Sequence, residues 1–159
     1  MILLVLMPVR NLLYVCTGNV FRSPVAEEIT KQLLEDSKMK MDVESAGIQK
    51  YNGEPLRKEL LDLIKRYKID MSAYVPKQVN ARLVNKADLI LVFDDAQLRE
   101  LGKKFPSTKN KTYTIKDYVG CTDYSTEDLW GKPVELFEGF IKETKLDIQK
   151  CLDRIGGRQ

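Results

Sequence analysis

The chain has 159 residues, of which 43% are hydrophobic and 31% charged, and its formal net charge is +3. These values are typical of a soluble globular protein with a single domain, and the net charge is too small to indicate a nucleic-acid partner by itself. Histidine is absent, which excludes Ser-His and Cys-His catalytic pairs and most zinc sites. Any catalysis must therefore use Cys, Asp, Glu, Lys, Arg or Tyr.

The three cysteines, Cys16, Cys121 and Cys151, are too few for a disulfide framework and favour a reducing, cytoplasmic location. Residues 1–10 begin with an apolar run that is too short to span a bilayer and lacks the basic start and small-residue cleavage site of a secretory signal. We therefore expect an N-terminal extension over 1–10, with no membrane role, followed by one domain over 11–159.

Apolar runs and amphipathic runs alternate in the first half of the chain. A buried strand is predicted over 12–15 and a helix over 24–35, with Pro24 at its first position and acidic residues in its first turn, Glu27 and Glu28. A short strand over 41–46 ends at Gly47. The apolar residues between 56 and 67 then recur with helical spacing.

The second half continues the alternation. The continuous apolar run over 87–93 is typical of a strand inside a parallel sheet, and a short helix over 97–105, a last strand over 112–115 and a long helix marked by Val134 to Leu152 follow. The order βαβαβαβα predicts an α/β fold: an open four-stranded parallel sheet, Rossmann-like, with helices on both faces. Active sites of such sheets lie at the carboxyl ends of the strands, where Cys16 is placed.

The segment CTGNVFR, from Cys16 to Arg22, leaves a strand and enters a helix. Backbone N–H groups in such a loop can converge on an anion, and Gly18 and Asn19 tolerate the unusual dihedrals that this requires. The Arg22 guanidinium can hold two oxygens of a phosphate. The segment therefore predicts an oxyanion-binding loop.

Cys16 lies at the base of this loop. A helix N-terminus and a nearby cation favour the thiolate form of a cysteine, and Ser23 can donate a hydrogen bond to it. A thiolate beneath a bound phosphate is placed for in-line attack on phosphorus. The glycine-to-lysine spacing of nucleoside-triphosphate-binding loops is absent, so hydrolysis of nucleoside triphosphates is disfavoured.

The stretch VCTGNVFRSPVAE resembles the phosphate-binding loop of the low-molecular-weight protein tyrosine phosphatases. The resemblance runs from about Asn11 and includes further segments: SAG at 45–47, ADLILVFDDAQLREL at 87–101 and EDLWGKPVELFEGF at 127–140. It implies the phosphotyrosine phosphatase I type of fold, a phosphorylated protein as substrate, and a phosphocysteine mechanism without metal or other cofactor.

The same resemblance implies roles for residues of the loop. Cys16 is the expected nucleophile and Arg22 the expected phosphate clamp. The residues between them are expected to bind the substrate: Thr17, Gly18, Asn19, Val20 and Phe21. A family histidine that orders the loop corresponds here to Tyr74, which we expect to hydrogen-bond Asn19 with assistance from Ser45.

Cleavage of a phenyl phosphate needs a proton donor because the conjugate acid of a phenoxide has a pKa near 10. With no histidine in the chain, Asp or Glu is the expected acid. The family has an Asp-Pro-aromatic segment before its last helix, and the matching residues here are Asp128, Leu129 and Trp130. We predict that Asp128 is the general acid and then the base for hydrolysis of phosphocysteine, with Glu127 and Asp123 as alternatives.

Two aromatic residues, Tyr51 and Trp130, fall where the family places the rings that enclose the substrate. Val20 is apolar, whereas members that resemble protein-arginine phosphatases have threonine at this position, so Val20 favours an aromatic ring over a guanidinium. Phe21 replaces a second cysteine that many members carry before the arginine. Asp94 and Asp95, which follow the third strand, are interpreted as structural or helix-capping residues.

Phosphotyrosine hydrolysis is thus the leading hypothesis and protein-arginine phosphatase activity its alternative. An arsenate reductase shares the fold and loop but needs relay cysteines that are missing after the third strand. A non-catalytic phosphate-binding module is disfavoured because Cys16, Arg22 and Asp128 are all present. The lysine-rich stretch over 103–116 is interpreted as a solvated loop rather than a nucleic-acid site. We expect a monomer or weak dimer.

Overall fold

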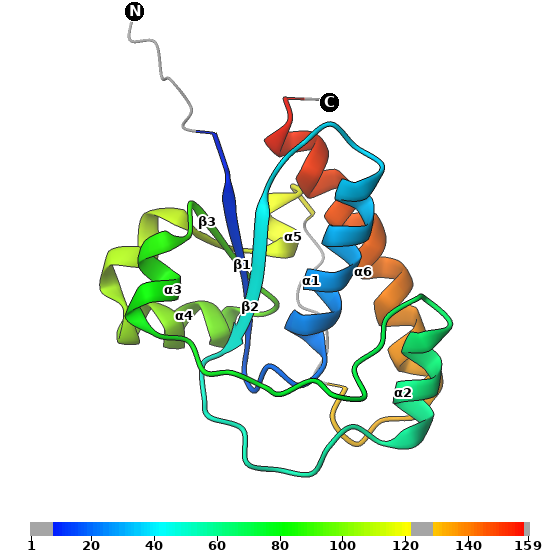
Figure 1. Ribbon diagram of the computed structural model, residues 1–159. Coiled ribbons are helices and arrows are strands. Elements are labelled where there is room, and N and C mark those ends of the chain that lie inside the picture. The colour runs from blue at the N-terminus through cyan, green and yellow to red at the C-terminus, as the bar shows by residue number, and fades with distance from the viewer. Residues whose placement is uncertain (1–7, 122–128, 158–159) are drawn as a thin grey trace, which may run out of the picture.

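The computed structural model describes residues 8–121 and 129–157. Within these residues one sheet of four parallel strands has the order β2-β1-β3-β4 (Figure 1). The predicted α/β class and the four-stranded parallel sheet are confirmed. The elements are β1 (Asn11–Cys16), α1 (Arg22–Glu35), β2 (Asp42–Gly47), α2 (Lys58–Lys65), α3 (Ala81–Lys86), β3 (Leu89–Val92), α4 (Asp95–Lys104), the 3-10 helix η1 (Pro106–Lys111), β4 (Thr112–Thr114), α5 (Ile115–Tyr118) and α6 (Val134–Ile155).

Helices cover both faces of the sheet, as predicted. Helices α1, α2, α5 and α6 lie on one face of the sheet, and α3 and α4 lie on the other (Figure 1). Successive side chains of a strand point to opposite faces, so Leu12 and Tyr14 of β1 join the first core while Leu13 and Val15 join the second. A central strand buried on both faces needs apolar residues throughout, which explains the unbroken apolar runs in the sequence.

Helix α1 begins two residues earlier than predicted. Its first residue is Arg22, so Pro24 occupies the third helical position, and the first turn contains no acidic residue. Proline is tolerated there because the first four N–H groups of a helix have no intrahelical acceptor. The expectation that Glu27 and Glu28 lie in the first turn is therefore wrong. The early start makes Arg22 the first residue of the helix, from where it pairs with Asp94 after β3.

Two short α-helices and the 3-10 helix η1 were not predicted, and the interpretation of 103–116 as a solvated loop is wrong, because η1 and β4 lie within this stretch. Helix α3 has six residues and α5 has four, lengths at which an amphipathic period cannot be recognised. Each is capped by a side chain that accepts a backbone N–H, from Asn80 and Thr114 respectively. Helix α2 is shorter than its apolar stripe: Leu56 and Tyr67 pack on the core from outside it. Among the described residues, no helix has the length and apolar character that crossing a membrane requires.

Candidate functional site

The loop from Cys16 to Arg22 lies at the carboxyl end of the central strand β1, where the topology predicted a site. Cys16 is the last residue of β1 and Arg22 the first of α1, and the Cys16 side chain is buried. Asn19 adopts the left-handed conformation expected of it, with φ of 57°. This reversal folds the loop back over the sulfur, so that the Asn19 N–H points at Cys16 Sγ from 3.2 Å.

A second hydrogen-bonding group reaches the sulfur from α1. The Ser23 hydroxyl lies 2.9 Å from Cys16 Sγ, as the sequence suggested. The Asn19 Nδ2 group donates to Ser23 Oγ over 2.8 Å, which leaves the hydroxyl proton of Ser23 available for the sulfur. Donors that point at sulfur stabilise its anionic form. The surroundings of Cys16 therefore suit a thiolate.

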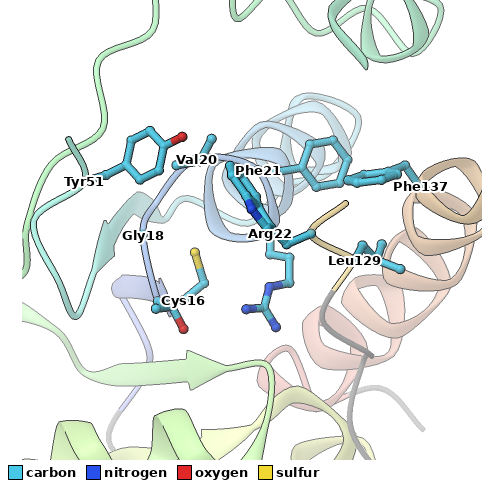
Figure 2. A pocket seen from close by; sticks show the side chains of 10 residues that line it. Cys16, Gly18, Val20, Phe21, Arg22, Tyr51, Leu129 and Phe137 are labelled. Carbon is cyan, nitrogen blue, oxygen red and sulfur yellow. The ribbon is translucent and has the colours of Figure 1, made fainter. Parts of the chain in front are cut away.

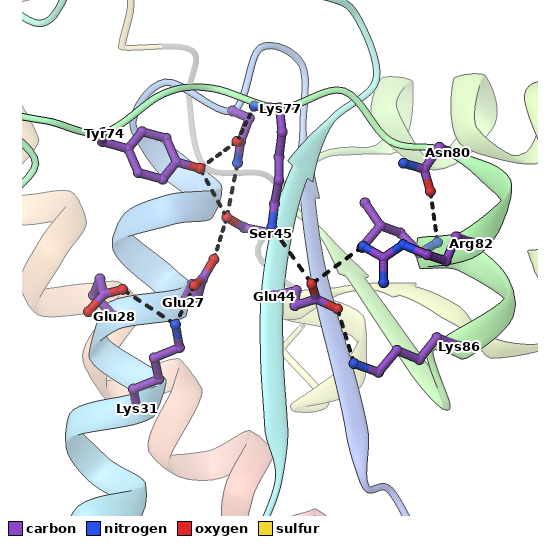
Figure 3. A network of polar contacts seen from close by, with 12 residues as sticks. Glu27, Glu28, Lys31, Glu44, Ser45, Tyr74, Lys77, Asn80, Arg82 and Lys86 are labelled. Carbon is purple, nitrogen blue, oxygen red and sulfur yellow. Dashed lines mark hydrogen bonds and ion pairs between the residues drawn. The ribbon is translucent and has the colours of Figure 1, made fainter.

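A buried polar network holds Asn19 in place (Figure 3). The expected hydrogen bond is confirmed: the Tyr74 hydroxyl donates to Asn19 Oδ1, and Asn19 Nδ2 donates to Ser45 Oγ over 3.0 Å. The Ser45 hydroxyl in turn donates to Glu27 Oε1 over 2.7 Å. Burial raises the pKa of Tyr74 to about 12, so this tyrosine is a neutral donor at ordinary pH. Glu27 was not predicted to take part; its contact with Ser45 depends on the packing of α1 against β2.

The Arg22 guanidinium is held beside the loop by an ion pair. Its NH1 group lies 3.3 Å from Asp94 Oδ2, and the guanidinium stands 5.9 Å from the centre of the Phe93 ring. The other carboxylate oxygen of Asp94 accepts the Gln97 N–H at the start of α4. The prediction that Asp94 caps a helix is thus confirmed, and the structure adds its contact with Arg22.

Gln97 is a supporting residue that the sequence did not indicate. Its side chain is almost fully buried, receives the Phe93 N–H at 2.9 Å and donates to Thr17 Oγ1 at 3.2 Å. It therefore ties the first residue after Cys16 to the end of β3. A lone glutamine on a charged helix carries no pattern that would have revealed this contact.

Gly47 is a second residue whose role only the structure shows. A β-carbon there would lie 2.7 Å from the carbonyl carbon of Gly18 and 2.9 Å from the backbone nitrogen of Asn19. Real β-carbons do not approach other atoms so closely. The end of β2 can therefore support the loop only because residue 47 has no side chain.

A pocket of about 230 Å³ opens above Cys16 (Figure 2). Figure 2 shows Tyr51 on one side and Phe21, Leu129 and Phe137 on the other, with the sulfur and the Arg22 guanidinium beneath. The ring of Trp130 is 67% exposed and stands edge-on to that of Tyr51, with the centroids 6.2 Å apart. An aromatic-walled pocket above an anion-binding loop suits a flat ring that carries a phosphate.

Most of the expected substrate-binding residues line this pocket, namely Thr17, Gly18, Val20, Phe21, Tyr51 and Trp130. Asn19 is the exception. Its side chain is fully buried and lies outside the lining, because it serves the network beneath the loop. The expected acid Asp128 and its alternatives Glu127 and Asp123 lie outside the described residues. Leu129 and Trp130, which follow Asp128 in the chain, both line the pocket.

Comparison with known proteins gives a consistent result. The family model described as "Low molecular weight phosphotyrosine protein phosphatase" matches residues 11–156. The chain is 34% identical to a low molecular weight protein-tyrosine-phosphatase of Acinetobacter johnsonii, over 92% of this chain and 95% of that protein. It is 29% identical to a protein-arginine-phosphatase of Geobacillus stearothermophilus, over 96% of this chain and all of that protein.

A solved structure of this family has the same fold as this chain. The crystal structure of a low molecular weight protein tyrosine phosphatase from T. tengcongensis superposes with a TM-score of 0.82 at 32% identity, covering 91% of this chain and 99% of that one. The chain is therefore similar to phosphatases whose names refer to protein tyrosine or to protein arginine.

Proposed function

Because this chain belongs to the low molecular weight phosphotyrosine protein phosphatase family, we propose that it hydrolyses phosphotyrosine in proteins through a phosphocysteine intermediate on Cys16. The observation that carries the proposal is the position of the Cys16 sulfur, which lies at the base of an aromatic-walled pocket and accepts the Asn19 N–H. In this proposal, the loop amides and Arg22 bind the phosphoryl group above this sulfur.

Binding of the phosphate depends on the loop and on Arg22. Backbone N–H groups of the loop and the N-terminal end of α1 attract the dianion, and the Arg22 guanidinium can hold two of its oxygens. Asp94 holds the guanidinium at the edge of the loop from 3.3 Å. Arg22 is thus positioned in advance and need not be ordered when the substrate binds.

The chemistry then proceeds in two displacements. In the first, the Cys16 thiolate forms an S–P bond while the P–O bond to the phenol breaks, and Asp128 protonates the departing oxygen. In the second, Asp128 accepts a proton from water, which attacks phosphorus and releases inorganic phosphate and the Cys16 thiolate. The Ser23 hydroxyl, 2.9 Å from the sulfur, stabilises the thiolate each time it is formed.

The pocket favours phosphotyrosine over phosphoarginine. Val20 and the rings of Tyr51 and Trp130 offer apolar and aromatic contacts to a phenyl ring, and the side chain of Val20 has no oxygen to accept from a guanidinium. Phosphoarginine remains the second candidate substrate, because relatives over nearly the whole chain include a protein-arginine-phosphatase. The experiment below distinguishes between the two candidate substrates.

We infer a reducing, cytoplasmic setting, because Cys16, Cys121 and Cys151 are all free thiols and oxidation of Cys16 would abolish attack on phosphorus. We also infer that the protein works without a cofactor, as a monomer or weak dimer.

Turnover of p-nitrophenyl phosphate, a phosphotyrosine peptide and a phosphoarginine peptide, each with EDTA present, tests the proposal. Wild-type protein should hydrolyse the first two, Cys16→Ser should abolish activity, and Cys121→Ser, outside the pocket, should retain it. Asp128→Ala should slow phosphotyrosine hydrolysis on the order of 10²–10⁴-fold, whereas Glu127→Ala and Asp123→Ala should not. Activity that survives Cys16→Ser, or that prefers phosphoarginine, would contradict it.

A further inference from the structure

A second hollow adjoins the candidate active site. Its volume is about 230 Å³, and it lies between the segment that follows Tyr51, helix α2 at Leu61, and the segment from Met71 to Pro76. Val20 and Tyr51 line both hollows. These two side chains therefore form a ridge, and only their thickness separates the second hollow from the phosphate pocket.

The three side-chain hydroxyls that line the second hollow already donate to acceptors inside the protein. The hydroxyl of Tyr51 donates to the carbonyl oxygen of Glu54, that of Ser72 to the Asp70 carboxylate, and that of Tyr74 to Asn19. No charged side chain is among the described residues that line it. A charged occupant would lose hydration here without gaining a side chain of opposite charge among the described lining residues.

The rest of the lining is apolar and comes from Pro55, Leu56, Leu61 and Met71. Burial of apolar surface against these side chains favours an apolar occupant. The volume is sufficient, because an apolar cavity of about 150 Å³ accepts a molecule as large as benzene. The hollow thus suits an aliphatic or phenyl side chain.

We propose that this second hollow binds an apolar side chain of the substrate protein, one or two residues from the phosphorylated residue. The inference rests on the proposed function, because it requires a peptide anchored in the phosphate pocket. Consecutive Cα atoms lie about 3.8 Å apart and an extended chain rises about 3.3 Å per residue, so a neighbouring side chain can cross the ridge of Val20 and Tyr51. The site therefore selects among phosphorylated sequences as well as for the phosphate itself.

The test uses a set of phosphotyrosine peptides in which one position is varied. This position lies one or two residues before or after the phosphotyrosine and holds leucine, alanine, aspartate or lysine. At one or more positions leucine should raise kcat/KM over alanine on the order of tenfold, and aspartate and lysine should not. Hydrolysis of p-nitrophenyl phosphate, which is too small to cross the ridge, reports the proposed function separately.

The variant Leu61→Glu probes the hollow directly. It should reverse the preference, so that kcat/KM for the lysine peptide exceeds kcat/KM for the leucine peptide. Leu61→Ala should weaken the preference for leucine. The matched control is Leu146→Glu, on an α6 side chain that is 66% exposed and outside both hollows; it should retain the wild-type preference.

Two results would overturn the inference alone. Equal kcat/KM for all peptides, with p-nitrophenyl phosphate still hydrolysed, would remove the second hollow as a substrate site and leave the proposed function standing. A leucine preference that both Leu61 variants retain would place the selecting contact elsewhere. Absence of turnover with every substrate would overturn the proposed function and this inference together.

Discussion

Gly47 at the end of β2 packs directly on the backbone of Gly18 in the loop proposed to bind phosphate, where a β-carbon on Gly47 would come within 2.7 Å of the Gly18 carbonyl carbon. The clash would be with backbone rather than with a flexible side chain, so one of the two segments would have to move. In the proposed mechanism the loop amides and the Cys16 sulfur face the same phosphate, so such a movement should affect catalysis before it affects the fold.

Gly47→Ala should therefore lower kcat/KM for p-nitrophenyl phosphate on the order of 10²-fold, because small misplacements of catalytic groups have effects of this size. It should also destabilise the protein by about 1–3 kcal/mol, the usual effect of overpacking. Steady-state kinetics and urea unfolding measure the two effects.

Gly139→Ala is the matched control for this variant. Gly139 lies within α6, and a β-carbon there would meet nothing within 4 Å. Alanine should stabilise this helix by about 0.5–1 kcal/mol and leave kinetics unchanged. A Gly47→Ala enzyme with wild-type kcat/KM would show that the loop does not need this close approach.

Tyr74→Phe should remove one of the two described hydrogen bonds to Asn19 Oδ1, the other being the Lys77 N–H at 2.9 Å. We expect a loss of about 1 kcal/mol in the free energy of unfolding at pH 7, and a lower kcat because the loop is held less firmly. Kinetics and denaturant unfolding at pH 7 give both values.

The same variant has a defined pH dependence. Burial raises the pKa of Tyr74 to about 12 in the folded protein, against 10.0 for an ordinary tyrosine. The unfolded chain therefore loses this proton first as the pH rises, so the stabilising contribution of Tyr74 is complete below pH 10 and is lost between 10 and about 12. The stability difference between wild type and Tyr74→Phe should shrink over that range and stay constant from pH 6 to 9.

Asp94 has two roles, which two substitutions can separate. Its carboxylate caps α4 through the Gln97 N–H and pairs with Arg22. Asp94→Asn should keep the cap and the stability, whereas Asp94→Ala should cost about 1 kcal/mol. Both variants should raise KM for aryl phosphates severalfold, because Arg22 loses its charged partner. An unchanged KM in both would show that the ion pair does not position Arg22.

Oxidation should inactivate the protein in a way that thiols reverse poorly. Phe21 stands where a resolving cysteine would be, and its ring packs against Phe137 with the centroids 5.0 Å apart. Burial raises the pKa of the Cys151 thiol to about 12, which keeps that thiol unreactive. Peroxide-treated enzyme should regain little activity with dithiothreitol, and mass spectrometry should find sulfinic or sulfonic acid at Cys16. Full recovery would contradict this.

Local and periodic features of the sequence determined the fold class and the centre of the site. Buried central strands must be apolar throughout, so the runs over 12–15 and 87–93 identified β1 and β3 and the parallel sheet between its helices. The segment from Cys16 to Arg22 is contiguous, and its chemistry follows from the side chains and from its place between a strand and a helix. Among the described residues, the helices α3 and α5 and the 3-10 helix η1 escaped recognition, because they are too short to show a period.

The tertiary structure alone decided which distant residues support that segment. Glu27, Gly47 and Gln97 reach the loop or its hydrogen-bonding network from α1, β2 and α4, and nothing in their local sequence indicates the residue that each will contact. The ridge of Val20 and Tyr51 between two hollows likewise arises only when three separate segments pack together. Sequence periodicity determines which face of an element is buried, whereas contacts between elements depend on strand order and register, which long-range packing selects.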